Sequence, residues 1–257
     1  MTALLHHQLS GPADAPVLVL GNSLGTTAGI WDGQLPALER HFRVLRYDHR
    51  GHGRSEVPPG PYTIDELGED LVALLDRLGI GRASLCGLSL GGMVGMWLAS
   101  RLPERVERLA LISTSARLGP PERWTERAAV ARADGTAALT EMQAARWFTP
   151  SFRERAPAAV AAVLAMLAAT PAEGYAGCCE AIGAMDLRAD LPAITAPTLV
   201  VVATDDPATP PEHAEVIAAG IGHAKLELVD DAAHIVSVEQ SERVTSLLLD
   251  HLVPGTG

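Results

Sequence analysis

The sequence of 257 residues is poor in cysteine, containing only Cys86, Cys178 and Cys179. So few thiols do not form a disulfide framework, and the adjacent pair would make a strained bridge. The cysteines also lack the paired spacing of a zinc site. The first sixteen residues contain no basic segment followed by a long apolar one, so we expect no secretory signal peptide. Together these absences predict a cytoplasmic protein with reduced thiols.

Long hydrophobic runs and an excess of basic residues are also missing. No apolar run approaches the roughly 18 residues typical of a membrane span, and the alanine-rich stretch 158–170 is expected to be a packed helix. The formal net charge of −11 argues against a nucleic-acid-binding surface, which needs clustered basic residues. We therefore expect neither a membrane nor a nucleic acid as partner. An anionic small molecule would need local positive charge in its pocket.

The sequence does contain an alternation of strand-like and helix-like segments. A well-marked helix is expected over 63–79, where Thr63 and Glu66 have the spacing of a capping box and Gly79 follows the last turn. Strands separated by such helices predict an α/β fold whose mostly parallel sheet has helices on both faces. The segments expected to contain strands are 16–21, 42–48, 83–87, 106–113, 196–206 and 224–234, and a last helix is expected over 238–252.

Between the fourth and fifth of these segments the pattern changes. Residues 116–190 are alanine-rich, charged and helical in character, without a convincing strand. A helical insertion within an α/β sheet is the simplest interpretation. We therefore predict an α/β core formed by residues 1–115 and 191–257, with a helical cap at 116–190.

The motif "GLSLG" at 87–91 follows an expected strand and precedes an expected helix. This G-x-S-x-G pattern in a strand–turn–helix context is typical of a nucleophilic serine, here Ser89. Glycines are needed because side chains at the flanking positions would collide with the neighbouring strand and helix. The alternative is an ordinary Gly/Ser turn.

A serine nucleophile needs a general base and an acid that orients it. His234 lies in the loop after the last expected strand, at the edge where parallel sheets assemble their sites. His52 lies in a glycine turn, and the other seven histidines, His49 among them, lie in surface-like stretches. Asp205 and Asp206 follow the preceding strand. We choose Asp206 because Asp206 and Pro210 have the D-x-x-x-P spacing of a recurrent loop.

Acyl transfer also needs two N–H donors for the oxyanion. The first is expected to be the backbone N–H of Leu90, directly after the nucleophile. The second is expected from the loop "GNSLGTT" at 21–27, where Leu24 is favoured and Ser23 is the close competitor. A glycine-rich turn without a catalytic role is the alternative for this loop.

These motifs together resemble the α/β-hydrolase superfamily over nearly the whole chain. Within it, the chain is similar to the 3-oxoadipate enol-lactonases in the stretches "GNSLGTT", "YDHRGHGRS", "GLSLGGMVGMWLA", "ARWFTPSF", "DPATPP" and "AAHIVSVEQ". The resemblance implies hydrolysis of an enol-lactone that carries an acetate arm, giving 3-oxoadipate in the β-ketoadipate pathway. Ser89, His234 and Asp206 would form the triad, and no metal or organic cofactor is required.

The carboxylate arm of such an anionic lactone predicts a cationic group in the pocket. Arg146, beside Trp147 in the cap, is the candidate, and a solvated helix arginine is the alternative. Trp31 either lines the pocket or packs as a buried aromatic side chain. Other serine hydrolases, namely esterases, carbon–carbon bond hydrolases and cofactor-free perhydrolases, share these motifs. Hydrolase-like receptors with slow turnover are a further alternative.

Overall fold

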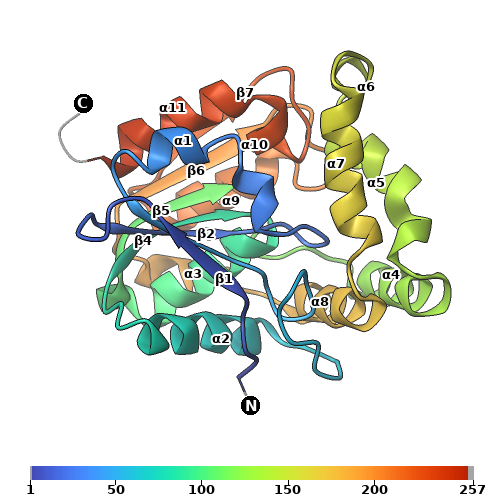
Figure 1. Cartoon of the computed structure of the whole chain (residues 1–257), viewed down its shortest axis with the longest axis horizontal. Helices are drawn as coiled ribbons and strands as arrows, with labels where there is room; N and C mark the ends of the chain where they lie inside the picture. Colours follow the sequence, from blue (N-terminus) through green and yellow to red (C-terminus); the bar gives the residue numbers. More distant parts are fainter. Residues whose placement is uncertain (1, 254–257) are drawn as a thin grey trace.

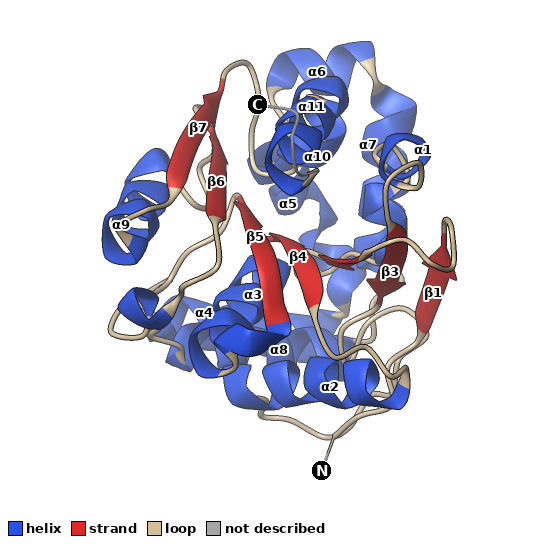
Figure 2. Cartoon of the chain, turned by 90° about the vertical axis from the view of Figure 1, so that its left-hand side faces the viewer, coloured by secondary structure: helices blue, strands red, loops and turns tan. Residues whose placement is uncertain are grey.

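The computed structural model describes residues 2–253, so residue 1 and residues 254–257 of the predicted core lie outside the described residues. Seven strands form one sheet in the order β1-β3-β2-β4-β5-β6-β7, in which β1 is antiparallel to β3 and every other neighbouring pair is parallel (Figure 2). The strands are β1 (His7–Ser10), β2 (Val17–Gly21), β3 (Arg43–Tyr47), β4 (Ala83–Leu88), β5 (Val106–Ile112), β6 (Thr198–Ala203) and β7 (Lys225–Val229). The predicted α/β class with a mostly parallel sheet is confirmed.

Helices cover both faces of this sheet, as the alternation predicts. The helices α2 (Ile64–Arg77) and α3 (Leu90–Arg101) lie on one face, and α1 (Leu35–Leu38) and α11 (Ser241–Leu252) lie on the other (Figures 1 and 2). The helix α9 (Pro211–Ile221) packs against β6 and β7. The capping box at the start of α2 is present, since Thr63 and Glu66 each accept a hydrogen bond from the other's backbone N–H.

Five helices between β5 and β6 form the predicted helical stretch, and we call them the cap helices. They are α4 (Pro121–Asp134), α5 (Thr140–Trp147), α6 (Pro150–Arg155), α7 (Pro157–Ala168) and α8 (Ala172–Ala184). They gather at one side of the sheet, and α4 packs along α8 (Figure 1). The division into a core and a cap at 116–190 stays a prediction.

No single helix within residues 2–253 has both the length and the apolar character to cross a membrane. Taken together, α7 and α8 meet those two criteria, but the pair is bent by 93°.

The centre of the core is formed by β4 and α3. Every residue of β4 is buried, and so is every residue of α3 from Leu90 to Ala99. A Cβ added at Gly91 would lie 2.3 Å from the backbone carbon of Gly21, so the first turn of α3 packs directly on β2. This close approach fixes the turn between β4 and α3 at the carboxyl edge of the sheet.

Candidate active site

Ser89 connects β4 to α3 in a backbone conformation that few residues other than glycine adopt. Its φ is 54° and its ψ is −111°, which costs conformational energy that the surroundings must offset. Its N–H donates to the Ile112 carbonyl at 2.9 Å, and its carbonyl accepts from the Thr114 hydroxyl at 2.7 Å. A Cβ at Gly87 would lie 2.2 Å from the Gly91 backbone, so the turn requires the glycines of the motif.

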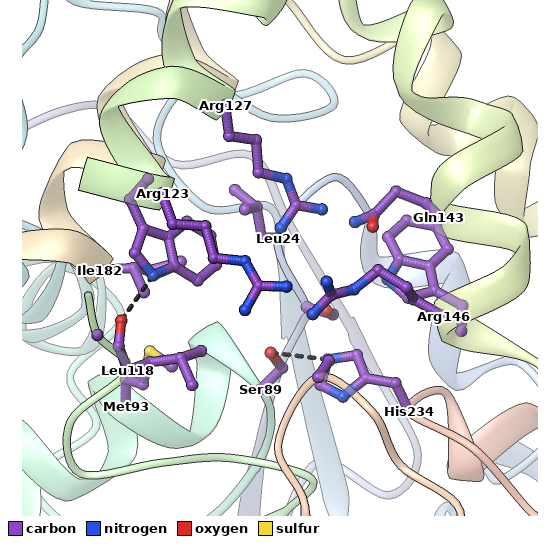
Figure 3. Close-up of a pocket in the computed structure, with 15 residues that line it drawn as sticks. Leu24, Ser89, Met93, Leu118, Arg123, Arg127, Gln143, Arg146, Ile182 and His234 are labelled. Atoms are coloured by element: carbon purple, nitrogen blue, oxygen red, sulfur yellow. Dashed lines mark hydrogen bonds between the residues drawn. The ribbon is translucent and has the colours of Figure 1, made fainter. Parts of the chain in front are cut away.

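The structure brings Ser89, His234 and Asp206 together, although they follow three different strands. The Ser89 hydroxyl donates to His234 Nε2 at 3.0 Å, and His234 Nδ1–H donates to Asp206 Oδ2 at 2.9 Å. Ser89 is only 6% exposed, and its hydroxyl faces a cavity that His234 also lines (Figure 3). This arrangement lets the imidazole accept the serine proton while the carboxylate stabilises the resulting imidazolium.

Asp206 is held by its own loop as well as by His234. Its carboxylate accepts hydrogen bonds from the backbone N–H groups of Ala208 and Thr209 at 2.8 and 3.0 Å and from the Thr209 hydroxyl at 2.7 Å. Burial alone would raise the pKa of Asp206, but the charge and the hydrogen bond of His234 and the two hydrogen bonds from Thr209 hold that pKa below its usual value. Asp205 is exposed and does not contact the imidazole. The contribution of Thr209 was not predicted from the sequence.

The loop after β2 lies on the other side of Ser89. Ser23 and Leu24 both line the cavity. The next N–H, of Gly25, donates to Nε2 of the buried His52 at 2.9 Å, and this bond anchors the loop. Leu90 is the first residue of α3, where backbone N–H groups have no acceptor within the helix. The roles of Leu24, with Ser23 as competitor, and of Leu90 as oxyanion donors stay predictions.

The cavity above Ser89 lies between the sheet edge and the cap helices. Arg146 and Trp147, both predicted from the sequence, line it. Trp31 does not: it is fully buried at the end of the short helix η1 (Ala28–Trp31), which packs against β2 and α10 (Val236–Glu239). The pocket-lining interpretation of Trp31 is therefore wrong. The remaining lining residues are Ser23, Leu24, Ser89, Met93, Leu118, Gly119, Arg123, Trp124, Arg127, Gln143, Ile182, Ala208 and His234.

Two further arginines that the sequence reasoning missed point into this cavity beside Arg146 (Figure 3). Arg123 and Arg127 are four residues apart on α4, so they lie on one helix face. Arg127 stacks over the rings of Trp124 and Tyr175, at 5.3 and 5.7 Å from their centroids. Burial lowers the pKa of Arg146, and repulsion by Arg127 and Arg123 lowers it further. The i, i+4 spacing of Arg123 and Arg127 was the sequence pattern that could have indicated a shared cationic helix face.

The loop that carries His234 is tied to the cap helices by hydrogen bonds. Next to His234, the Ile235 N–H donates to the Trp147 carbonyl at 3.0 Å. The buried Glu239 carboxylate accepts from the Ala233 N–H at 3.0 Å and from both the N–H and the hydroxyl of Thr149. Movement of α5 relative to the core would therefore displace the imidazole.

Chemically, the cavity offers a nucleophile, a base and a cluster of cations. Within residues 2–253, no group of three or more His, Cys, Asp or Glu side chains is placed to hold a metal ion. All three cysteines are buried and unbonded to one another. The site is suited to attack on an acyl carbon of an anionic molecule.

Comparison with known proteins agrees with this geometry. Residues 16–241 match the model of the alpha/beta hydrolase fold family. The chain is 41% identical to 3-oxoadipate enol-lactonase 2 of Acinetobacter baylyi, over 93% of this chain and 89% of that protein. It is also 34% identical to the putative carbamate hydrolase RutD of Stutzerimonas stutzeri, over 98% of each chain.

Among solved structures, the enol-lactonase from Burkholderia xenovorans superposes with a TM-score of 0.95, at 46% identity over 96% of each chain. The resemblance to the enol-lactonases that the motifs indicate is therefore confirmed. The chain belongs to the α/β-hydrolase fold family, and it is a hydrolase.

Proposed function

We propose that this protein hydrolyses 3-oxoadipate enol-lactone to 3-oxoadipate through an acyl-enzyme on Ser89. One observation carries the proposal: the hydrogen-bonded chain Ser89–His234–Asp206 opens into a cavity that also contains three arginines. A serine with its base supplies acyl-transfer chemistry, and the guanidinium groups supply affinity for the carboxylate of the substrate. The enol-lactonase relatives at 41% and 46% identity support the same substrate.

In the first half of the reaction, Ser89 attacks the lactone carbonyl while His234 takes its proton. The backbone N–H groups of Leu24 and Leu90 stabilise the oxyanion. Breaking the ring ester bond releases an enolate that remains part of the same molecule and becomes a ketone on protonation, so this leaving group departs easily. In the second half, His234 activates water to release the acyl group. None of these steps uses a metal or an organic cofactor.

The proposal assigns Arg146 to the substrate carboxylate, with Trp147 as an adjacent wall. Arg146 is half-buried in a protein of net charge −11, and within residues 2–253 it has no carboxylate partner in an ion pair. A cation in such a place is stabilised by an anionic ligand. The partner is accordingly a small anionic lactone rather than a nucleic acid or a membrane. The three free, buried thiols support a cytoplasmic location.

A substrate panel tests this function directly. We expect kcat/KM for the enol-lactone to exceed that for its neutral methyl ester by about 30-fold or more, because a charge pair in the cavity is lost with the ester. Neutral aryl esters, a carbamate and a carbon–carbon hydrolase substrate are expected to react more slowly still. Preference for the carbamate would move the assignment to the RutD-like activity. A single slow turnover with every substrate would indicate a receptor.

A further inference from the structure

The cavity contains more positive charge than the proposed substrate can neutralise. Arg123, Arg127 and Arg146 all line it, and within the described part of the chain none of them forms an ion pair with a carboxylate. Other cap arginines do form such pairs: Arg132 on the same helix contacts Glu173 and Glu180 at 2.8 and 2.6 Å. The enol-lactone carries a single carboxylate, so a surplus of cations remains after it binds.

The three guanidinium groups enter the cavity from two elements. Arg123 and Arg127 come from α4 and Arg146 comes from α5. In Figure 3, Arg123 and Arg146 reach from opposite sides toward Ser89 and His234, whereas Arg127 lies farther from Ser89, next to Gln143. The positive charge therefore falls into two places, one at the nucleophile and one deeper under the cap helices.

Gln143 provides independent evidence that the part of the cavity around Arg127 binds a ligand. It lines the cavity and is 3% exposed, and within residues 2–253 its carboxamide forms no hydrogen bond, so its Nε2–H group can donate to an anion. The Nε and Nη2 donors of the neighbouring Arg127 are likewise buried without an acceptor in this part of the chain. Buried polar groups are nearly always hydrogen-bonded, so an unpartnered carboxamide facing a cavity indicates a polar ligand. Gln143 and Arg146 are three residues apart on α5 and share one face of it.

We propose that this cavity binds linear dicarboxylates as dianions. In the bound dianion, one carboxylate lies at Arg127 and Gln143, and the other lies between Arg123 and Arg146 next to Ser89. The arm carboxylate that Arg146 binds in the lactone is therefore displaced toward Arg127 once hydrolysis creates the second carboxylate. The inference rests on the proposed function, because hydrolysis creates the second carboxylate at the serine. The acyl C–O bond breaks, the hydroxyl of water joins the acyl carbon, and a proton is released. The product thus carries one more negative charge than the lactone and binds more tightly, so it inhibits its own formation.

Adipate, its monomethyl ester and hexanoate are the probes for this site. Each is tested as a competitive inhibitor of neutral aryl ester hydrolysis by the wild-type protein, and by calorimetry without substrate. We expect adipate to bind at least about tenfold more tightly than the monomethyl ester, which has the same length but one charge fewer. Equal affinities for adipate and its monoester would overturn the inference.

Arginine substitutions test which residues produce the preference for adipate over its monomethyl ester. Arg123→Gln and Arg127→Gln should each reduce the ratio of the two affinities toward one. Arg132→Gln removes the same charge from the same helix outside the cavity and should leave the ratio unchanged. If the ratio of the affinities for adipate and its monomethyl ester is unchanged in both cavity variants, or falls equally in Arg132→Gln, the two-carboxylate site is refuted.

The two proposals fail separately. Lactone hydrolysis with no preference for adipate contradicts only the dicarboxylate site. Preference for adipate without lactone hydrolysis contradicts only the proposed function.

Discussion

At the scale of single residues, the contrast between Asp205 and Asp206 is the sharpest. The two carboxylates are adjacent in sequence, but only Asp206 lies against His234, at 2.9 Å. Asp206→Asn should lower kcat for the enol-lactone by roughly 10³- to 10⁴-fold, because an amide no longer fixes the imidazole tautomer that accepts the serine proton. Steady-state kinetics of both variants provide the test. Asp205→Asn should stay near the wild type, and the reverse ranking would contradict the assignment.

A second residue-scale prediction concerns His49. Burial, reinforced by the neighbouring His52, lowers the pKa of His49 to about 3. Between the usual histidine pKa near 6.5 and that value, the unfolded chain binds a proton here that the folded chain does not. The stabilisation is therefore complete above that usual pKa and decreases as the pH falls through this window.

His49→Gln separates this contribution from those of other histidines. Glutamine retains an N–H donor for the Asn22 carbonyl, which His49 Nε2 contacts at 3.1 Å, but it does not titrate. Urea unfolding at pH 7 and pH 5 should show a smaller loss of unfolding free energy in the variant than in the wild type. An equal loss would mean that His49 does not carry the acid sensitivity.

Residues that belong to a recognised local motif could be assigned to the site from the sequence. The glycines around Ser89 and the D-x-x-x-P loop at Asp206 are required by the local backbone conformation, so they are visible in the sequence. The structure brings Ser89 and Asp206 into contact with His234. His49 had no such pattern: it was expected at the surface, but it is 1% exposed. Its burial depends on packing against Tyr47 and His52, which the local sequence does not encode.

At the scale of elements, the buried Glu239 joins the His234 loop to the cap helices. Its carboxylate accepts from Ala233 and Thr149, so Glu239→Gln would place an amide N–H against backbone N–H donors. Leaving such donors unsatisfied costs about 1–3 kcal/mol. We expect kcat/KM to fall about tenfold or more as the loop shifts.

The exposed Glu242 on the next helix provides the matched control. Glu242→Gln should leave both kcat/KM and the melting temperature unchanged. If Glu239→Gln lowered the melting temperature with full activity, the carboxylate would stabilise the fold without positioning His234.

Elements with strong periodicity and caps were predictable, and those defined by tertiary contacts were not. The capping box placed α2 correctly. The polar edge strand β1 was missed because pairing with β3 rather than composition makes it a strand. The final helix, expected over 238–252, is divided at Gln240, whose φ of −123° and ψ of 50° interrupt the helix between α10 and α11. No residue pattern there indicates the break.

At the scale of the whole molecule, the cavity above Ser89 has a charge opposite in sign to the net charge of the protein. The protein carries a formal charge of −11, yet three arginines that form no ion pair within residues 2–253 gather above Ser89. The sequence predicts that an anionic ligand needs such a local exception, and it identifies Arg146. Arg123 and Arg127 could not be assigned, because the packing of α4 along α8 decides which face of α4 meets the cavity.

The proposed mechanism requires that side chains following β4, β6 and β7 meet at one edge of the sheet. The chain offers a control, since the buried Ser115 also lies 2.7 Å from a histidine, His213, outside this cavity. The deciding measurement is kcat/KM for the enol-lactone in Ser89→Ala and Ser115→Ala, with folding checked by circular dichroism. We predict a loss of at least about 10³-fold for Ser89→Ala and near wild-type rates for Ser115→Ala. Near wild-type hydrolysis by a folded Ser89→Ala protein would contradict the role of Ser89 as the nucleophile.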